Sequence, residues 1–578
     1  MDSSSSLDDD EAEVWEDNYL VSLKNQKLLE RTGILPPDSY MVRQSYINGK
    51  MRSVLVDWLA GVVQFLKLRS DIFYSCVNIV DAYLARKDVL RSNLQLLGVA
   101  AVSLSAKYNN STYPDLVEYC LLSDEAYTKE QIIKMEKEVF IVLGCDLGGI
   151  PIDLNYLRAL SSMCGASQKE HNMSKYLLSI IKVYVQPFLP SVYATAIRKI
   201  AAYLEDGKYT NIYKVRDAAV NSCMSCVVKL CNTIHASKLQ GYKKLDKRSL
   251  AEWSDFLPRV CALKIHFDAT IDVSEYYRAT YYKEHLQLAL IVPPVISAKP
   301  QKLGRGVYST VLSLNYKGTQ YAVKKMRPEL TREGIPHTVL REISLGLLLD
   351  HPNVAKIRYL SEDLGSIFFD LGVSDMYQWF VGNGPLSRDM QKVFAIQMFE
   401  ALAYIHGMGC MHRDIKPQNI ICYGSYDKPR FVLSDFGLAR GPGITLKNDT
   451  FNKEVITLWY RPPELFLGSP VYNASVDIWS MLCVLYEVST GKPLFDELSE
   501  LEMLTMIFRF LGTPNDSTWE GVEDLPFYIA NGPTFRGVAK PFSKYRTLSK
   551  LSRKILTKGL KTNPNLRPTA KEVLKMLE

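Results

Sequence analysis

The segments MHRDIKPQNII (residues 411–421) and LSDFGLAR (residues 433–440) decide the fold of the second half of this 578-residue chain. Asp414 can accept the proton of a hydroxyl group, and Lys416 can steady a phosphoryl group during its transfer. Asn419 and Asp435 offer the few oxygen ligands that Mg²⁺ takes beside substrate phosphates. The two segments therefore predict a site for phosphoryl transfer.

Features that come earlier in the chain point to the same chemistry. Gly304 and Gly306 lie in a turn between two strand-like runs, where backbone N–H groups can approach phosphates closely. Lys324 follows in the strand-like run YAVKK, and Glu342 in the helical run LREISL can pair with it. A lone Gly-x-Gly is usually only a turn, and a lone Asp-Phe-Gly is usually only a loop. The prediction depends on their joint occurrence in this order.

The ordered set resembles protein kinases over about residues 297–578: glycine loop, strand lysine, helix glutamate, HRDxKxxN, DFG and PPE. The resemblance implies a bilobal α+β fold that uses ATP and Mg²⁺. It also implies a gatekeeper at Phe369 and a hinge from Asp370 to Gly372. The implied ATP-binding residues are Leu303, Gly304, Gly306, Val311, Ala322, Lys324, Phe369, Asp370 and Gly372.

Within the protein kinases, the chain resembles the cyclin-dependent kinases. The segments that carry this resemblance are EGIPHTVLREISL (333–345), EVITLWYRPPELFLG (454–468), VDIWSMLCVLYEVSTGKPLF (476–495) and IFRFLGTPND (507–516). Lys416, two residues after Asp414, is the pattern of the serine/threonine kinases.

The same resemblance implies further residue roles around the segment 454–468. Thr457 would brace the catalytic Asp414 and Lys416, and Glu464 would pair with Arg567. A pocket that favours proline after the target residue would be shaped by Val455, Ile456 and Arg461. The resemblance thus implies Ser/Thr-Pro sites in protein substrates.

The activation segment departs from the family at one position, because Asn452 stands where the activating phosphothreonine is usual. Arginine forks bind phosphate strongly, and three that would clasp this phosphate are present: Arg341, Arg413 and Arg440. Either Thr450 or Thr445 is the acceptor, or an acidic residue such as Asp449 takes its place. As a further alternative, the arginines pair with nearby carboxylates.

Three other positions differ from the family or bear on regulation. Tyr308 stands at the family's inhibitory phosphotyrosine, but the usual threonine beside it is Val307. Ser309 replaces the third glycine of the loop, and Leu482 replaces a usual glycine. We expect both replacements to be tolerated.

The first half of the chain has helical periodicity and little strand-like alternation, which predicts an all-helical region over residues 14–240. The run 94–108 is apolar and rich in small residues on every side, as suits a central helix. Thr128 and Gln131 form a capping-box signal. In the run 51–66, the residues of one apolar helix face are Val54, Leu55, Trp58, Leu59, Val62, Val63 and Leu66.

These helical segments resemble the cyclin box of A- and B-type cyclins over residues 40–150, with a more divergent second repeat over 151–240. The segments are MRSVLVDWL (51–59), LQLLGVAAVSLSAKY (94–108) and EAYTKEQIIKMEKEVFIVLGCDLG (125–148). In the family, Lys107 and Glu136 would contact the kinase beside its regulatory helix. The alternative is an exposed ion pair, which contributes little.

The cyclin resemblance also implies a patch that docks peptides bearing an Arg-x-Leu motif. Its residues would be Met51, Leu55, Trp58 and Gln95. The alternative is that these are ordinary core residues. Gly61 stands where the family has an acidic patch residue, so the patch departs from the pattern at one position.

Length and composition agree with several globular domains. Apolar residues make up 47% and charged residues 23%, as in ordinary globular proteins. At about 150 residues per domain, the chain is expected to hold three or four domains. The predicted divisions are an acidic tail (1–13), a cyclin box with its N-terminal helix (14–150), a second cyclin-like repeat (151–240), a connector (241–296), a kinase N-lobe (297–372) and a C-lobe (373–578).

Charge and cysteine usage bound the setting and the partners. The net charge of +7 is too dilute to indicate a nucleic-acid partner, and the apolar runs are too short to span a bilayer. The 11 cysteines lack paired spacing, which favours a reducing compartment. Cys223, Cys226 and Cys231 are expected to be buried helix residues, not metal ligands. We therefore expect an intracellular protein, in the nucleus or cytoplasm.

The combined resemblance implies a cyclin and its kinase on one polypeptide, joined by an intramolecular cyclin–kinase contact. We expect transfer of the γ-phosphate of MgATP to protein substrates, in control of the cell cycle, with kinase inhibitors or docking-motif proteins as further partners. The alternatives are a transcription-associated cyclin-dependent kinase, a catalytically weak kinase-like scaffold, and a DNA-binding factor with a cyclin fold. The dilute charge argues against the last.

Overall fold

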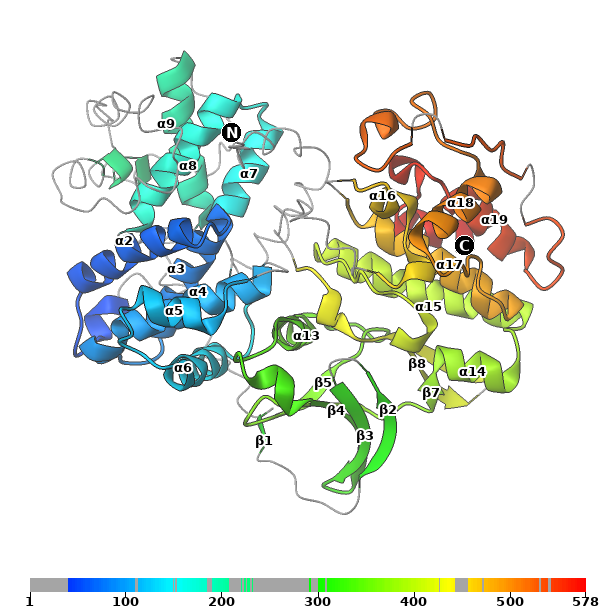
Figure 1. Cartoon of the computed structure of the whole chain (residues 1–578), viewed down its shortest axis with the longest axis horizontal. Helices are drawn as coiled ribbons and strands as arrows, with labels where there is room; N and C mark the ends of the chain where they lie inside the picture. Colours follow the sequence, from blue (N-terminus) through cyan, green and yellow to red (C-terminus); the bar gives the residue numbers. More distant parts are fainter. Residues whose placement is uncertain are drawn as a thin grey trace. The chain divides into compact units, whose positions relative to one another are not determined.

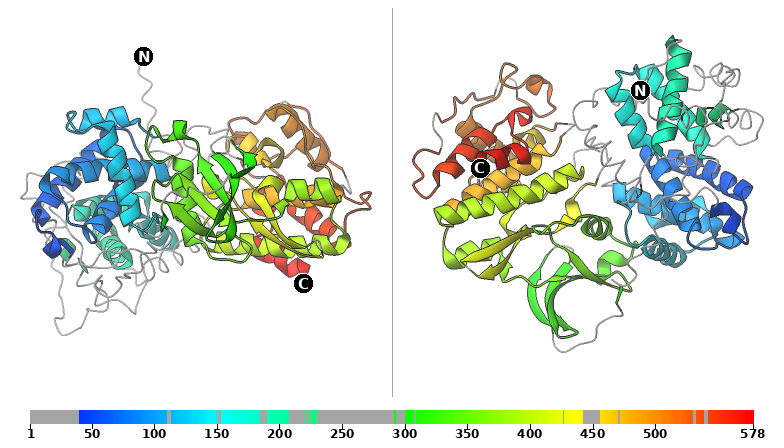
Figure 2. Two further views of the ribbon diagram at one scale, coloured as in Figure 1. Left: turned by 90° about the horizontal axis from the view of Figure 1, so that it is seen from below. Right: turned by 180° about the vertical axis from the view of Figure 1, so that it is seen from behind.

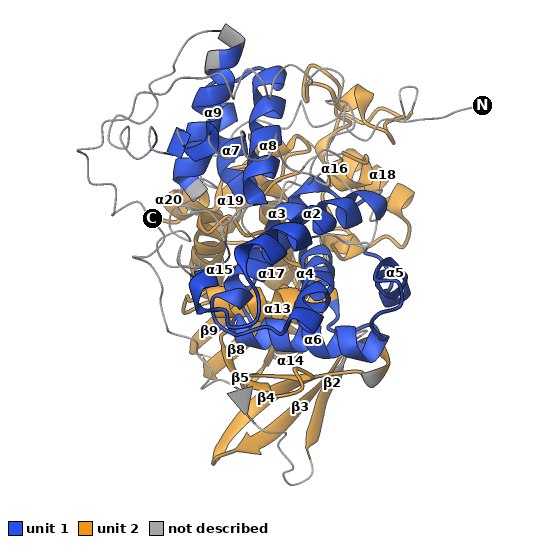
Figure 3. Cartoon of the chain, turned by 90° about the vertical axis from the view of Figure 1, so that its left-hand side faces the viewer, with its two compact units in different colours: residues 1–288, 330–336 blue, residues 289–329, 337–578 orange. Residues whose placement is uncertain are grey.

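The chain divides into two compact units, Met1–Leu288 with Leu330–Pro336 and Ala289–Glu329 with His337–Glu578 (Figure 3). The predicted tail and most of the predicted connector lie outside the residues that the structure describes. The computed structural model describes residues 40–109, 113–148, 150, 153–183, 190–206, 220, 223–224, 226–228, 231, 291–292, 300–306, 309–425, 427–441, 456–469, 472–529, 532–538 and 542–578.

The described secondary-structure elements of the first unit are helices and 3₁₀ turns (Figure 1). The capping box predicted at Thr128 is confirmed, because its side chain accepts a bond from the backbone N–H of Gln131 while Gln131 bonds back. The elements are η2 (Tyr40–Arg43), α2 (Gly49–Phe65), α3 (Ser70–Leu84), η3 (Arg91–Asn93), α4 (Leu94–Asn109), α5 (Leu116–Leu122), α6 (Lys129–Val142), α7 (Asp153–Met163), α8 (Gln168–Lys182) and α9 (Pro190–Asp206).

Helix α4 is the central helix of this unit, as its small residues predict. Every residue of α4 except Gln95 is buried, and α2, α3 and α6 pack around it. Close packing needs a small residue at Gly98, because a methyl group there would lie 2.8 Å from Leu55 Cδ1. The sequence of α4 therefore sets how near α2 can lie.

The apolar face predicted for α2 is correct at its centre and wrong at its edge. Leu55 and Leu59 are buried, whereas Val54 is 60% exposed. Helix α2 packs against α3 and α4, and Val54 lies outside the face that they cover. The predicted apolar face of α2 is therefore wider than the surface that α3 and α4 cover.

A buried ion pair ties the N-terminal helices together. Arg52 of α2 donates to Asp81 of α3 through Nε and Nη2, at 2.7 and 2.8 Å, and Tyr40 donates to the same carboxylate at 2.6 Å. Arg52 also donates to the carbonyl of Val183, after α8, at 3.0 Å. Helices α7, α8 and α9 pack on one another as a second group, so Arg52 joins both groups.

The second unit contains two antiparallel-rich sheets (Figures 1 and 2). A six-stranded sheet has the order β1-β5-β6-β4-β3-β2, and a three-stranded sheet has the order β7-β8-β9. The strands are β1 (Ile291–Val292), β2 (Gln301–Arg305), β3 (Ser309–Tyr316), β4 (Thr319–Met326), β5 (Ile357–Ser361), β6 (Ser366–Asp370), β7 (Ser374–Asp375), β8 (Ile420–Ser425) and β9 (Lys428–Leu433).

One helix of this unit packs beside the larger sheet, and the other helices follow it in sequence. Helix α13 (His337–Leu348) packs beside β5 of the larger sheet (Figure 2). The other helices are α14 (Met376–Asn383), α15 (Arg388–Gly407), α16 (Pro463–Phe466), α17 (Ser475–Thr490), α18 (Glu500–Leu511), α19 (Lys550–Gly559) and α20 (Ala570–Leu577). The 3₁₀ turns are η9 (Pro328–Thr331), η10 (Pro417–Asn419), η11 (Phe436–Leu438), η12 (Leu458–Tyr460), η13 (Val522–Asp524) and η14 (Pro564–Leu566).

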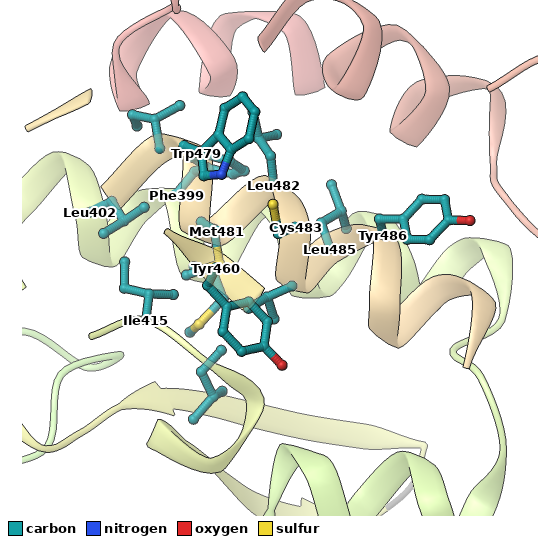
Figure 4. Close-up of a cluster of buried hydrophobic side chains, with 14 of the residues drawn as sticks. Phe399, Leu402, Ile415, Tyr460, Trp479, Met481, Leu482, Cys483, Leu485 and Tyr486 are labelled. Atoms are coloured by element: carbon teal, nitrogen blue, oxygen red, sulfur yellow. The ribbon is translucent and has the colours of Figure 1, made fainter. Parts of the chain in front are cut away.

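Helix α17 runs through the main hydrophobic core of the second unit. Trp479, Leu482 and Tyr486 lie in this core with Phe399 and Leu402 of α15 (Figure 4). The described elements agree with the predicted fold class, which is an all-helical region followed by an α+β region. Among the described helices, none is both long and apolar enough to cross a bilayer.

The pairing predicted between Glu464 and Arg567 is confirmed. Both oxygens of Glu464 accept bonds of 2.6 Å from Arg567, whose guanidinium also lies over the ring of Trp479. Neither charged side chain is accessible to solvent, at 1% and 0% exposure. The pair joins η14, after α19, to α16.

Leu482 is accommodated by a glycine on a different helix. Leu482 of α17 is fully buried, and the side chain contacts the Cα side of Gly559, the last residue of α19. A methyl group at Gly559 would overlap Leu482 Cδ1. The larger residue on α17 and the missing side chain on α19 therefore compensate for each other.

We expect Gly559→Ala to lower the free energy of unfolding by about 1–3 kcal/mol, because the added methyl group overpacks the site. In a Leu482→Ala background the same substitution should cost much less, since space is then available. Denaturant unfolding of the four chains measures the difference. Gly407→Ala is the matched control, because Gly407 also ends a helix and a methyl group there meets open space. An equal cost in both backgrounds would contradict the compensation.

Candidate active site

Lys324 and Glu342 are brought together by a strand and a helix. Strand β4 lies between β3 and β6, where Lys324 pairs with Val311 on one side and Ile367 on the other. This position holds the backbone of Lys324 on both sides. The Nζ atom lies 2.9 and 2.8 Å from the two carboxylate oxygens of Glu342 on α13.

Asp435 completes a cluster of three charges. Its Oδ1 atom accepts a bond of 2.9 Å from Lys324 Nζ. Burial alone would lower the pKa of Lys324, but the carboxylates of Glu342 and Asp435 outweigh it and raise that pKa above its usual value. Burial raises the pKa of Glu342 to about 7. Lys324 therefore stays charged, while Glu342 depends on Lys324 to remain ionised near neutral pH.

A second group of side chains surrounds Asp414. Thr457 Oγ1 donates to Asp414 Oδ1 at 2.8 Å, and Lys416 Nζ donates to Asp414 Oδ2 at 2.7 Å. Lys416 also reaches Thr457 Oγ1 at 3.1 Å. Asn419 Nδ2 donates to the carbonyl and to Oδ2 of Asp414, at 2.8 and 3.0 Å. The structure thus brings together four residues that were predicted to act as one site.

The backbone beneath Asp414 is held by a residue that sequence reasoning missed. Asp477, at the start of α17, accepts bonds of 2.8 Å from the backbone N–H groups of His412 and Arg413. It also pairs with His406 at 2.9 Å. Although burial raises the pKa of Asp477, the imidazoles of His406 and His412 and the N–H of Arg413 bring it below its usual value. An acidic residue in the otherwise apolar run VDIWSML was the available signal.

The predicted glycine loop joins β2 and β3, which pair antiparallel as expected. Gly306 N–H donates to the carbonyl of Ser309 at 2.8 Å, so the ends of the two strands lie close together. A methyl group at Gly304 would meet open space. Leu303 is 43% exposed, whereas Ser309 is buried. Tyr308 lies outside the described residues.

The predicted hinge continues directly from β6. Gly372 needs its missing side chain, because a methyl group there would overlap Ile421 of β8. The carbonyl of Asp370 accepts a bond of 2.9 Å from the Tyr423 hydroxyl, and the Asp370 carboxylate pairs with Arg358 at 2.6 Å. Tyr423 and Arg358 were missed, since neither lies in a recognisable motif. They fix the hinge from the side of β8 and β5.

The donor set suits a magnesium ion held together with phosphates. Both bonds from Asn419 are made by its nitrogen, so its oxygen Oδ1 is the atom left to face a cation. The Asp435 carboxylate is 43% exposed, so it can take part in a shared site. In the described part of the chain no group of three or more His, Cys, Asp or Glu side chains could hold a metal alone. Asn419 and Asp435 would need the oxygens of ATP to complete a coordination sphere.

The three arginines predicted to clasp a phosphate are all buried. The exposed fractions of Arg341, Arg413 and Arg440 are 2%, 2% and 4%. Arg413 donates to the carbonyl of Leu438 at 2.7 and 2.9 Å and to the Tyr472 hydroxyl at 2.7 Å. Among the described residues, Arg413 thus bonds to a backbone carbonyl and a hydroxyl group, both of which are uncharged. Asn452 and the candidate acceptors Thr445, Asp449 and Thr450 lie outside the described residues.

The segment predicted to shape a proline pocket has an unusual backbone. Ile456 is buried and adopts a positive φ of 71°, which is rare for a β-branched residue. Its carbonyl accepts bonds from Nε and Nη2 of Arg461, at 3.3 and 3.1 Å. Val455 lies outside the described residues.

In the first unit, Lys107 and Glu136 form a buried pair, so the alternative of an exposed pair is wrong. Lys107 Nζ lies 2.7 and 2.9 Å from the Glu136 oxygens, and the two residues are 1% and 0% exposed. Lys107 donates a further bond of 2.7 Å to the carbonyl of Glu333. Glu333 belongs to the segment Leu330–Pro336, which is grouped with this unit and directly precedes α13 in sequence.

The side chain of Glu333 is also held by the helical unit, and sequence reasoning missed it. Its carboxylate pairs with Lys129 at 2.9 Å and accepts the Leu116 N–H at 3.1 Å. The next residue, Gly334, has a positive φ of 83°, and a methyl group there would overlap Glu136. Glu333 and Gly334, the first two residues of EGIPHTVLRE, therefore both lie against residues of the helical unit.

The residues of the predicted docking patch differ in exposure. Leu55 is buried, whereas Met51, Trp58 and Gln95 are partly exposed. Leu55 therefore serves the core, and the other three can be reached from solvent. Gly61 is partly exposed as well.

Two comparisons with protein families agree with this geometry. Residues 297–577 match the model of the protein kinase domain, and residues 22–148 match the model of the cyclin N-terminal domain. The chain therefore holds an N-terminal cyclin domain and a C-terminal protein kinase domain. A protein kinase domain in general uses ATP and a divalent metal, and acts on protein substrates.

Thr457→Ala should lower kcat by about 10- to 100-fold, because Asp414 loses a bond that sets its orientation. Thr457→Ser keeps the hydroxyl group and should restore most of the rate. Steady-state kinetics with a peptide substrate measure both variants. If Thr457→Ala and Thr457→Ser had equal rates, the hydroxyl bond would have no part in catalysis.

Proposed function

We propose that the chain is a cyclin-dependent serine/threonine kinase that carries its own A/B-type cyclin and acts in control of the cell cycle. One observation supports it most: Lys107 and Lys129 of the cyclin region hold Glu333, in the segment that leads into α13. Helix α13 bears Glu342, which pairs with Lys324. A cyclin region that fixes this segment would favour the position of α13 in which Lys324 is paired.

The proposed domains follow the same division. The cyclin box spans residues 14–150, a second cyclin-like repeat spans 151–240, and the kinase lobes span 297–372 and 373–578. The packing of α7, α8 and α9 on one another supports a second helical repeat. The connector, 241–296, keeps the cyclin and kinase at an effective concentration of roughly millimolar.

The proposed reaction is phosphoryl transfer to a substrate hydroxyl group. When bound, MgATP supplies the γ-phosphoryl group and the metal charge that neutralises the phosphates. Lys324 would bind phosphate oxygens, and Asn419 and Asp435 would hold the metal. Asp414 would orient the hydroxyl group and accept its proton as the oxygen–phosphorus bond forms and ADP leaves. Lys416 would stabilise the charge that develops on the transferred group.

We propose Ser/Thr-Pro sites as substrates. The carbonyl of Ile456 is already used by Arg461, so it is a poor acceptor for the backbone N–H of a bound peptide. An ordinary residue after the target would leave that N–H unpaired, which costs about 1–3 kcal/mol when buried. Proline has no N–H and avoids this cost.

Purified full-length chain should incorporate labelled phosphate from MgATP into a Ser-Pro peptide. Asp435→Asn should abolish incorporation, because the variant loses the charged metal ligand and the partner of Lys324. The melting temperature of both proteins controls for folding. No incorporation by the wild-type chain above the Asp435→Asn background would rule out the enzyme.

Cleavage at a protease site placed in the connector should make activity depend on concentration. The intact chain should keep its specific activity on dilution, since cyclin and kinase remain tethered. The cleaved chain should lose activity as its halves dissociate. A cleaved chain that stays fully active at nanomolar concentration would show that tethering is not needed, and the uncleaved chain treated with inactive protease is the control.

A further inference from the structure

Arg461 is held on two sides by groups of the second unit. Its Nε and Nη2 atoms donate to the carbonyl of Ile456, while Nη1 donates to Glu500 Oε1 at 2.8 Å. The Arg461 side chain is 9% exposed, and its guanidinium lies over the ring of Phe466. Burial lowers the pKa of Arg461 and Glu500 opposes that effect. Among the described residues, Glu500 is thus a carboxylate that pairs with the largely buried guanidinium of Arg461.

Helix α18 gives Glu500 a defined position. Glu500 is the first residue of α18, after the N-cap Ser499, whose side chain accepts the N–H of Glu502. A carboxylate in the first turn of a helix is favoured by the helix dipole. The indole of Trp459 donates to the carbonyl of Glu497 at 3.1 Å, which ties the loop before α18 to the segment that contains Ile456.

The geometry of Ile456 needs this support. A β-branched residue at positive φ is strained and persists only where its surroundings hold it. The two bonds from Arg461 to the Ile456 carbonyl are contacts of this kind. Arg461 can make them only while its guanidinium stays in the buried site.

We propose that Glu500 is the positioning residue that sets how strictly the kinase requires proline after the target residue. By fixing Arg461 against the Ile456 carbonyl, Glu500 keeps that carbonyl from accepting the N–H of any other residue. This inference rests on the proposed Ser/Thr-Pro specificity and adds the residue on which it depends. Glu500 lies well outside the segment 454–468 that carries the resemblance for the pocket.

Loss of the carboxylate has a definite consequence for selectivity. Without Glu500, the buried Arg461 would lack this charge partner, and such cations move toward water. The Ile456 carbonyl would then be freed for a peptide N–H. Substrates with an ordinary residue after the target would improve, whereas Ser-Pro substrates would gain nothing from the freed carbonyl.

The test compares kcat/KM for three peptides that differ only after the target serine: proline, alanine and N-methylalanine. The wild-type chain should prefer Ser-Pro over Ser-Ala, and the N-methylalanine peptide should resemble Ser-Pro because it also lacks the N–H. Glu500→Ala should reduce the Ser-Pro to Ser-Ala ratio about tenfold or more, chiefly through better use of Ser-Ala. The ratio is measured within one preparation, so a smaller folded fraction cancels from it.

Two further variants separate positioning from a general disturbance of α18. Glu500→Gln keeps an oxygen that can accept from Arg461 but removes the charge, so its selectivity should lie between those of the wild-type chain and Glu500→Ala. Glu502→Ala removes the side chain that bonds to Ser499 in the same helical turn but leaves the pair of Arg461 and Glu500. Its ratio should equal that of the wild-type chain.

The outcomes distinguish this inference from the function on which it rests. A wild-type chain that uses Ser-Pro and Ser-Ala equally would overturn both the proline preference and the role of Glu500. A wild-type preference that Glu500→Ala leaves unchanged would overturn the role of Glu500 alone. A loss of selectivity in Glu502→Ala as large as in Glu500→Ala would also overturn it, because α18 as a whole would then be responsible.

Discussion

The pairing of Lys324 with two carboxylates is the interaction on which the candidate active site depends. The three side chains come from β4, α13 and the turn before η11, so one cation joins a strand, a helix and a loop. Charges taken out of water are stable only when their partners are correctly placed. A shift of α13 would leave the buried carboxylate of Glu342 without its partner. The position of α13 therefore decides whether the three charges form one cluster.

The helical unit contains buried ion pairs at two places. Arg52 and Asp81 form a buried pair that holds α2 against α3, and Lys107 and Glu136 form another between α4 and α6. The second pair differs because Lys107 also holds the carbonyl of Glu333. Because Lys107 can donate to more than Glu136, this buried pair can also bind the segment that contains Glu333.

In the second unit, the cluster around Asp414 and the segment around Ile456 are held by different contacts. Asp414 is oriented by side chains within short reach, and Asp477 fixes the backbone beneath it. The segment around Ile456 is instead held by Arg461 and, through it, by α18. The proposed substrate selectivity could therefore change without disturbing the side chains around Asp414.

Much of the fold and most of the candidate site could be read from residue patterns, because these depend on local spacing. The capping box at Thr128, the central helix α4 and the cluster around Asp414 all follow from residues close in sequence or from a familiar order of motifs. Other features depend on how distant segments meet. The exposure of Val54, the space that Gly559 leaves for Leu482, and the partners of Glu333 and Arg461 involve residues far apart in the chain. No local pattern encodes these contacts, since each is set by the path of two backbones and by the volume left between them.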